Sequence, residues 1–212
     1  MKYLVLSSII ISIFLLYHLS NIKEGIQNKP STIVLLGDSI FQNKNYVPKH
    51  KSIEYLLKEK LTIPSIVLAE DNATIFNLQR QYNKIPNSIN KSSTNLYISI
   101  GGNDLLNGYE LNNINDYTLF NAIWNLYTQT ITSLIENTLC NIILTDIYYI
   151  TDPNYKKYLP IIEHWNSNLY LFAKRHDLQV FKISKILTKP TDFTHSIEPS
   201  VSGGKKLVNS FI

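Results

Sequence analysis

The sequence predicts a single α/β domain, built on a parallel sheet of about five strands with helices on both faces. Three observations predict this fold. Short apolar runs typical of buried strands recur along the chain, stretches with apolar residues at helical spacing separate them, and glycine directly follows two of the runs, at Gly37 and Gly101. Strands that alternate with helices are joined by right-handed crossovers into parallel sheets. The chain of 212 residues, 44% of them apolar, is long enough for one sizeable core and short for two.

The first 22 residues differ from the rest and are predicted to form an N-terminal signal or anchor segment. Lys2 precedes an apolar run over residues 3–19 that only three serines and His18 interrupt. As a helix this run spans roughly 25 Å, slightly under the ~30 Å of a bilayer core. No pair of small residues suited to cleavage follows it. We therefore expect an uncleaved anchor rather than a signal peptide that is removed.

A short polar stretch over residues 23–30 follows the anchor and carries Gly25 and Pro30, which is typical of a tether. The folded domain is then expected to cover residues 31–212. Lysines lie on both sides of the apolar run, so the positive-inside rule does not fix its orientation. We expect the domain to be extracytoplasmic, either membrane-anchored or secreted, with the membrane as the partner of the N-terminal segment.

Within the domain, strand and helix patterns alternate in order. Residues 32–36 form an apolar β-branched run that ends at Gly37, which is the pattern of a buried strand. Further strands are predicted at residues 66–68, 96–100, 141–148 and 180–183. Helices are predicted at residues 53–61, 75–82, 119–134, 161–172 and 204–211, where apolar residues recur at helical spacing. Ligands on such sheets bind beyond the carboxyl ends of the strands.

The composition excludes some classes of function. The net charge is +4, but the lysines are spread along the chain with no dense basic block, which argues against a nucleic-acid partner. The single cysteine, Cys140, precedes an apolar run and belongs to no metal-ligand spacing, so we interpret it as a small core residue. We expect no cofactor and no metal. The oligomeric state is not indicated by the sequence.

Ser39 is the first candidate for chemistry. It lies three residues past the first strand, at the expected start of a helix, preceded by Gly37 and Asp38. A serine at this place can simply cap a helix. It can also be a nucleophile, but only if a base removes its proton.

His195 is the candidate base. It differs from the other four histidines because Asp192 lies three residues earlier, in a segment that Pro190, Pro199 and Gly203 mark as a loop. An aspartate at this distance can accept the Nδ1 proton and leave Nε2 free to act as a base. A surface turn explains such a pair equally well when it occurs alone.

Asn103 is the candidate oxyanion donor. It follows the third strand and the pair Gly101-Gly102, so a tight turn places its amide at the carboxyl edge of the sheet. An ordinary turn is the alternative, since Gly, Asn and Asp are all favoured in turns. An amide N–H aimed at a developing oxyanion typically lowers the barrier by about 3 to 4 kcal/mol.

With these strings in this order, the chain resembles the SGNH hydrolases, also called the GDSL esterase/lipase family. The matching blocks are Gly37-Asp38-Ser39-Ile40, Gly101-Gly102-Asn103-Asp104 and Asp192-Phe193-Thr194-His195, and the similarity extends over residues 31–212. The resemblance implies a three-layer flavodoxin-like sandwich and ester hydrolysis through an acyl-enzyme.

The resemblance also implies roles for single residues. Ser39, Asp192 and His195 would form the catalytic triad, and the oxyanion hole would consist of the Ser39 and Asn72 backbone N–H groups and the Asn103 side chain. Gly37, Asp38, Gly102 and Asp104 would support the site, with the two aspartates holding loops. One position departs from the family pattern, because Asn72 stands where glycine is expected. Asparagine tolerates a left-handed backbone better than most residues, so its N–H can still point correctly.

We therefore expect a serine hydrolase that cleaves esters of small acyl, lipid or acetylated-sugar substrates at Ser39. Two alternatives remain at this stage. The same acyl-enzyme can be captured by an acceptor other than water, which would make the protein an O-acyltransferase. The chain could also be a membrane-tethered module that binds glycan or lipid without catalysis. Residues 41–47 and 105–109 are expected to line the entrance to the site.

Overall fold

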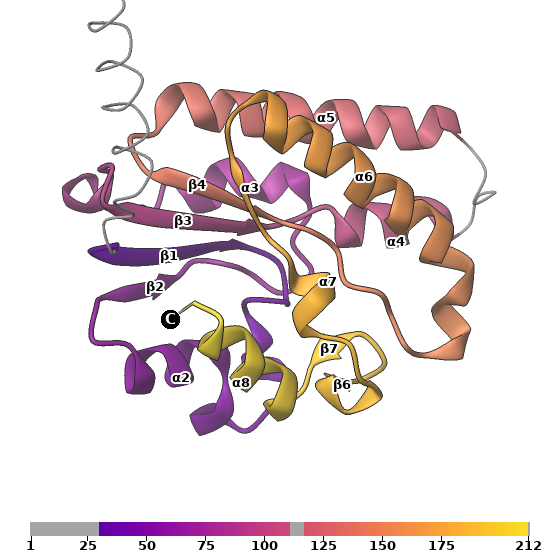
Figure 1. The fold of residues 1–212 in the computed structure, drawn as a ribbon, viewed down its shortest axis with the longest axis horizontal. Helices are drawn as coiled ribbons and strands as arrows, with labels where there is room; N and C mark the ends of the chain where they lie inside the picture. The colour runs from indigo at the N-terminus through magenta and orange to yellow at the C-terminus, as the bar shows by residue number, and fades with distance from the viewer. Residues whose placement is uncertain (1–29, 111–116, 212) are drawn as a thin grey trace, which may run out of the picture.

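The computed structural model describes residues 30–110 and 117–211; the predicted anchor, residues 1–22, and nearly all of the tether lie outside these ranges. Five parallel strands form the main sheet in the order β2-β1-β3-β4-β5 (Figure 1). Their bounds are Thr32–Gly37 for β1, Ser65–Val67 for β2, Thr94–Ser99 for β3, Asn141–Thr145 for β4 and Gln179–Phe181 for β5. All six residues of β1 are buried, as its unbroken apolar run requires. The predicted parallel α/β sheet is confirmed.

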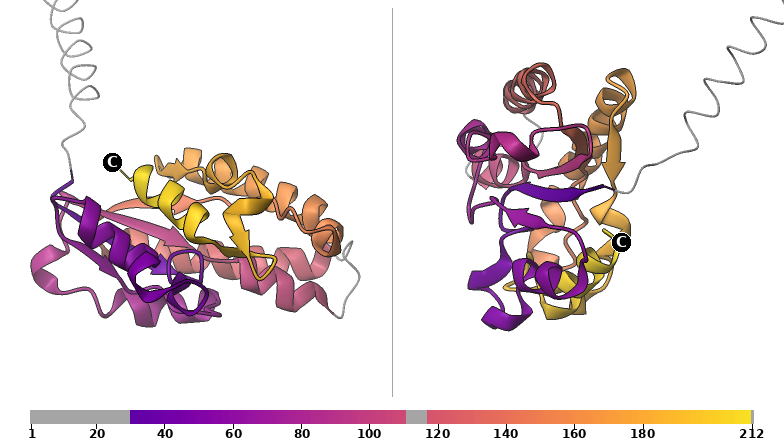
Figure 2. Two further views of the ribbon diagram at one scale, coloured as in Figure 1. Left: turned by 90° about the horizontal axis from the view of Figure 1, so that it is seen from below. Right: turned by 90° about the vertical axis from the view of Figure 1, so that its left-hand side faces the viewer.

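Helices cover both faces of the sheet, which makes three layers (Figure 2). On one face α2 (Ile53–Lys60) packs against α8 (Val201–Asn209). On the other face lie α3 (Ile75–Tyr82), α5 (Tyr117–Asn137) and α6 (Leu159–Arg175). The α5–α6 contact is aromatic, with the ring centroid of Trp165 lying 5.0 Å from that of Trp124 and 4.9 Å from that of Tyr127. Within the described ranges, no helix combines the length and the apolar character needed to cross a membrane.

Several boundaries differ from the sequence prediction. A helix, α4 (Gly102–Glu110), replaces the loop expected after Asn103, because Gly101 alone makes the turn, at a φ of +108°, and Gly102 already starts the helix. Strand β4 ends at Thr145, short of the predicted residue 148. The last helix begins at Val201 rather than at residue 204, since the Ser200 side chain caps it by accepting from two backbone N–H groups.

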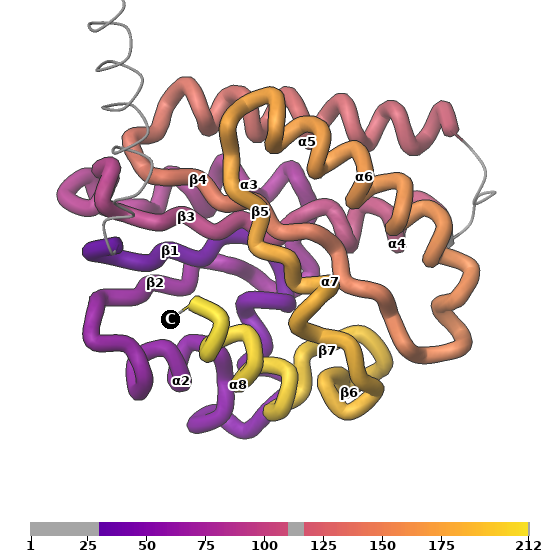
Figure 3. The backbone as a smooth tube through the Cα atoms, in the orientation of Figure 1, coloured from indigo at the N-terminus to yellow at the C-terminus, as the bar shows by residue number. Residues whose placement is uncertain are grey.

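Smaller elements complete the chain. These are α7 (Ile183–Ile186) and five short 3₁₀ helices, η1 (Asn43–Asn45), η2 (Lys49–Lys51), η3 (Asn87–Ile89), η4 (Pro153–Tyr158) and η5 (Pro190–Asp192). After η5, where the sequence predicts only a loop, β6 (Phe193–Thr194) and β7 (Glu198–Pro199) form an antiparallel hairpin. The hairpin and α8 lie beside the segment that follows β1 (Figure 3). This contact is fixed by the Asn43 side chain, whose Nδ2 donates to the Pro199 carbonyl at 3.2 Å.

Candidate active site

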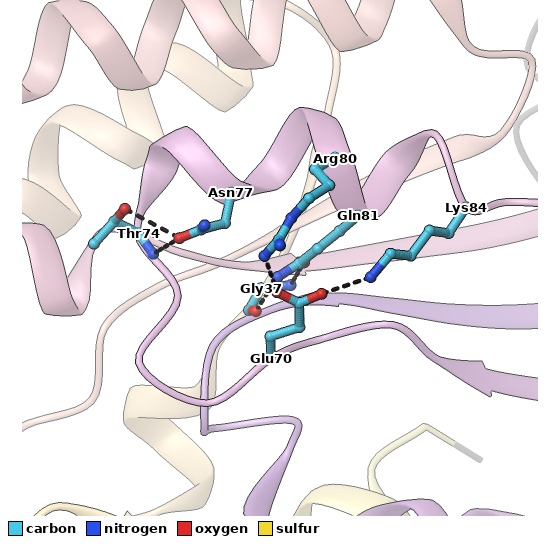
Figure 4. Close-up of polar contacts among 7 residues, drawn as sticks. All are labelled: Gly37, Glu70, Thr74, Asn77, Arg80, Gln81 and Lys84. Atoms are coloured by element: carbon cyan, nitrogen blue, oxygen red, sulfur yellow. Dashed lines mark hydrogen bonds and ion pairs between the residues drawn. The ribbon is translucent and has the colours of Figure 1, made fainter.

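Gly37 ends β1 in a conformation and a space that only glycine fits. Its φ is +124°, and a Cβ built on it would lie 1.7 Å from the Ser99 carbonyl oxygen on β3. The buried side chain of Gln81 on α3 holds the residue from the other side, with Oε1 accepting from the Gly37 N–H at 2.7 Å and Nε2 donating to the Gly37 carbonyl at 2.8 Å (Figure 4). These contacts fix where the chain leaves the sheet.

Ser39 lies two residues further on, in a turn rather than at a helix start. The Phe41 and Gln42 N–H groups both donate to the Asp38 carbonyl, which closes the turn around Ser39. The Asp38 side chain braces it, with Oδ1 accepting from the Ile40 N–H at 3.1 Å and from the Ser99 hydroxyl at 3.2 Å. Burial raises the pKa of Asp38 to about 7. The helix-capping alternative for Ser39 therefore does not apply.

Asn103 lies in the first turn of α4, and its side chain is fixed by the loop after β2. Its Nδ2 donates to the Ala73 carbonyl at 2.9 Å, which leaves one amide hydrogen for the pocket that Asn103 lines. The neighbouring Asp104 carboxylate accepts from the Ile75 N–H at 3.1 Å, at the start of α3, and its burial raises its pKa to about 6. Asp104 thus holds a loop, as Asp38 does.

The loop over residues 69–74 is braced by charged side chains on both sides. Glu70 forms ion pairs with Arg80 and with Lys84, both on or just after α3 (Figure 4). Asp71 accepts hydrogen bonds from the Asn45 amide and the Tyr46 hydroxyl, at 2.9 and 2.8 Å. Figure 4 also shows the cap of α3, where the Asn77 side chain accepts from the Thr74 N–H at 2.8 Å. The loop that carries Asn72 therefore has a defined path.

Asn72 has a φ of +57°, which is the left-handed conformation expected at a position where glycine is usual. Its side chain is exposed rather than directed into the core. Across the part of the chain that the structure describes, the backbone N–H groups of Asn72 and Ser39 have no hydrogen-bond acceptor. Both groups are therefore available to an oxyanion.

A largely apolar pocket opens beside Ser39 and Asn103. It encloses about 630 Å³, including space open to solvent. Its polar residues include Asp38, Ser39, Asn103 and Glu198. Most of its apolar wall comes from α4, from the segment after β4 and from α6. The wall consists of Ile40, Ile100, Leu105, Leu106, Ile147, Tyr148, Ile150, Tyr158, Ile161, Ile162 and Ile197. Residues 105 and 106 line this pocket from a helix, not from the loop expected there.

Asp192 is fully buried, but its partners are structural. Oδ2 accepts from the Lys206 ammonium at 2.6 Å and from the backbone N–H groups of Thr188 and Lys189 at 3.0 Å each. Burial alone would raise the pKa of Asp192, yet these three hydrogen bonds and the charge of Lys206 together hold it below the ordinary value of an aspartate. Oδ1 has no partner among the described residues. The expected hydrogen bond from His195 to Asp192 is therefore not formed.

His195 lies at the tip of the β6–β7 hairpin and is exposed. Its φ of +47°, and that of Ser196 at +69°, make the tight turn between the two strands. The ring packs 5.5 Å, centroid to centroid, from Tyr46, and Nδ1 lies 3.2 Å from the Thr194 hydroxyl. The structure thus brings Ser39 and Asn103 together at one pocket, whereas it directs Asp192 towards α8 and His195 towards solvent.

Glu198 is the residue that the sequence analysis does not single out. It starts β7, is 7% exposed, and lines the same pocket as Ser39. Burial raises its pKa to about 7, and the charge of Asp71 acts in the same direction. Its Oε2 atom has no partner within the described ranges. An acidic residue before a proline and a helix cap carries no sequence signal that distinguishes it from a surface glutamate.

Comparisons with known proteins agree with this architecture. The model of the family described as GDSL-like Lipase/Acylhydrolase matches residues 33–202. A search of curated proteins gives no match. Among solved structures, a lipolytic protein of the G-D-S-L family from Veillonella parvula aligns with a TM-score of 0.65 at 16% identity, covering 84% of this chain and 94% of that one.

Two further solved structures are esterases by their descriptions. The psychrotrophic esterase EstA from Pseudoalteromonas, in a structure inhibited by monoethylphosphonate, aligns with a TM-score of 0.61 at 16% identity, covering 85% of this chain and 93% of that one. An acetylxylan esterase from Geobacillus stearothermophilus aligns with a TM-score of 0.61 at 15% identity, covering 87% and 94%. At these identities the structural likeness concerns the fold.

Proposed function

The chain belongs to the GDSL-like lipase/acylhydrolase family and is an ester-cleaving hydrolase, and we propose that it works through an acyl-enzyme on Ser39. In this proposal Ser39 Oγ attacks the ester carbonyl carbon, and the Ser39 and Asn72 N–H groups and the Asn103 amide bind the resulting oxyanion. The supporting observation is that Ser39 and Asn103 line one pocket while both backbone N–H groups lack other acceptors among the residues described. The ester C–O bond then breaks and the alcohol leaves with the proton that Ser39 lost, after which water hydrolyses the acyl-enzyme, releases the acid and restores the Ser39 hydroxyl.

The wall of the pocket supports a substrate with an acyl chain longer than acetyl. Nine isoleucine and leucine side chains and two tyrosines line it, and such a surface gains little from a single methyl group. Each buried methylene contributes about 0.8 kcal/mol, or about fourfold in kcat/KM. An acetylxylan esterase is among the proteins of similar fold. The apolar wall of this chain favours short to medium acyl esters over acetylated sugar.

Hydrolysis of p-nitrophenyl acetate, butyrate and octanoate by the full chain in detergent tests this proposal. We expect kcat/KM to rise from acetate to butyrate, and Ser39→Ala to lower kcat by at least about 10³-fold while the protein stays folded. A fluorophosphonate should label the wild type at Ser39 and leave Ser39→Ala unlabelled. Retained turnover in pure Ser39→Ala protein would reject the nucleophile, and a preference for acetate would reject the acyl-chain assignment.

Two further parts of the proposal concern the acceptor of the acyl group and the location of the domain. Capture of the acyl group by an alcohol instead of water would make the enzyme an O-acyltransferase, and product analysis with added glycerol separates the two outcomes.

For residues 1–22 we propose a membrane anchor with an extracytoplasmic domain, because of the apolar run over residues 3–19. Fractionation of cells that express the full chain, and a chain lacking residues 1–22, tests this part independently.

A further inference from the structure

The pocket beside Ser39, which we call the acyl pocket because the proposed reaction places the acyl chain there, has one side built from irregular backbone. Strand β4 ends at Thr145, and residues 146–150, called the wall segment below, belong to no strand or helix. Four of these five residues line the pocket. Their backbone groups have no sheet or helix partners, so the segment needs other hydrogen bonds to keep one shape.

Asn166 on α6 supplies such bonds to the middle of the wall segment. Its Oδ1 accepts from the Ile147 N–H at 2.8 Å, and its Nδ2 donates to the Ile147 carbonyl at 2.7 Å. We call this pair of hydrogen bonds the α6 clamp. The chain leaves β4, turns at η4 and returns as α6, which brings the two residues together (Figure 1). Asn166 is buried but is not a lining residue of the pocket, so it can affect a substrate only through Ile147.

The residues on either side of the clamped one are tied through their side chains. The Asp146 carboxylate accepts from the Ser184 N–H at 2.9 Å and from the hydroxyls of Ser184 and Tyr170. The Tyr148 hydroxyl donates to the Ile197 carbonyl on the hairpin side. The α6 clamp differs from these bonds because it holds the main chain itself. It therefore fixes the path of the wall segment between its two tied side chains.

We propose that Asn166 is a positioning residue that sets the acyl-chain preference of the enzyme, an inference that rests on the proposed hydrolysis at Ser39. The clamp keeps the wall segment in one shape before a substrate arrives, so the acyl chain meets a fixed apolar surface at Ile147, Tyr148 and Ile150. A surface that is ordered in advance loses less conformational entropy on binding, so more of the gain from each buried methylene appears as affinity. Without the clamp the substrate itself has to order the segment.

A second clamp of the same kind holds the nucleophile and provides a matched comparison. Gln81 bonds through its amide to both the N–H and the carbonyl of Gly37, two residues before Ser39 (Figure 4). In each clamp one buried amide side chain engages both backbone groups of one residue at or just past the end of a strand. Loss of the Gln81 clamp should disturb the reacting serine, whereas loss of the α6 clamp should disturb only the surface that receives the acyl chain.

Three variants of the full chain separate these roles, with kcat and KM measured on p-nitrophenyl acetate and butyrate. Butyrate has two more methylenes, each worth about fourfold, so the wild type should favour butyrate by about 15-fold in kcat/KM. Asn166→Ala should bring this ratio below about 4 through a higher KM for butyrate, with kcat on acetate within about threefold of wild type. Gln81→Ala should lower kcat on both esters alike and keep the ratio. Asn168→Ala makes the same change elsewhere on α6, where the amide bonds with His164, and should match the wild type.

Asn166→Gln keeps an amide but moves it by one methylene, so its ratio should lie between those of Asn166→Ala and the wild type. Circular dichroism melting shows which variants are folded, and Asn166→Gln decides the test if Asn166→Ala does not fold. A wild-type ratio in the deciding variant, or an equal fall of kcat on both esters, would overturn the inference and leave the proposed hydrolysis intact. A wild type that hydrolyses neither ester, or that prefers acetate, would instead overturn the proposed function itself.

Discussion

Asp192 and Glu198 lie six residues apart in sequence and are both buried, yet their surroundings are opposite. Asp192 receives three hydrogen bonds on one oxygen, one of them from an ammonium group, and its pKa is lowered. Glu198 Oε2 has no partner among the described residues, and burial raises the pKa of Glu198 to about 7. A buried carboxylate surrounded by donors stabilises the fold in its ionised form, whereas burial without enough donors disfavours ionisation.

Removal of the charge at Asp192 should have the largest effect on stability. Asp192→Asn leaves Lys206 without its buried partner and weakens the bonds to the backbone N–H groups, so we expect the free energy of unfolding to fall by about 3 kcal/mol. Urea denaturation at pH 7 measures this loss of stability. An unchanged stability would remove the distinction between the two carboxylates.

Removal of the charge at Glu198 should change the free energy of unfolding in the opposite direction. Because the folded-state pKa of about 7 lies above the ordinary value near 4.5, ionised Glu198 destabilises the fold at pH 8. Glu198→Gln should therefore raise the free energy of unfolding at pH 8, by up to about 3 kcal/mol, and have little effect at pH 4. Denaturation curves at the two pH values test this. A variant that is less stable than wild type at pH 8 would contradict the assigned environment of Glu198.

The carboxylates of Asp192 and Glu198 should also affect the stability of the fold in different pH ranges. In wild type the raised pKa values of Glu198, Asp38 and Asp104 make the folded state bind more protons, so stability falls as pH rises from about 4 to about 7. The lowered pKa of Asp192 adds stability that is lost as pH falls below about 4. Melting temperatures should thus peak between the two ranges. Glu198→Gln should flatten the limb above the peak, and Asp192→Asn the limb below it.

Substitution of Lys206 should have the smallest effect on the free energy of unfolding. Lys206→Met removes the ammonium but leaves the Thr188 and Lys189 N–H groups on Asp192, so we expect a loss of about 1 to 2 kcal/mol. The variant also brings the pKa of Asp192 closer to the ordinary value, which chemical-shift titration of the carboxyl carbon detects. A loss equal to that of Asp192→Asn would mean that the backbone bonds contribute nothing.

The half of the site on the sheet edge can be predicted from the sequence for physical reasons. Ser39 and Asn103 each follow a buried apolar strand and a glycine, and the strand ends alone place them at one edge. Gly37 and Gly101 indeed adopt positive φ values. Gly102 does not make a turn but begins α4. A pair of adjacent glycines in the sequence does not show which of the two makes the turn.

The half on the hairpin cannot be predicted in the same way. The spacing of Asp192 and His195 suggests a local pair, but two residues with positive φ turn His195 to the hairpin tip. In the structure Asp192 accepts from Lys206 on the next helix, and Glu198 lines the pocket of Ser39 through the packing of the hairpin on the segment after β1. These contacts depend on tertiary structure, and sequence spacing does not encode them.

Tyr148 joins the two halves through a single side chain. Its ring lines the acyl pocket and packs 5.0 Å, centroid to centroid, from Phe193, while its hydroxyl donates to the Ile197 carbonyl beside Glu198. A substitution that reshapes the pocket here also removes the hydrogen bond that holds the strand of Glu198. The shape of the pocket and the position of the β6–β7 hairpin are therefore coupled through one residue, whereas a change in the α4 or α6 wall alters the pocket without breaking this hydrogen bond.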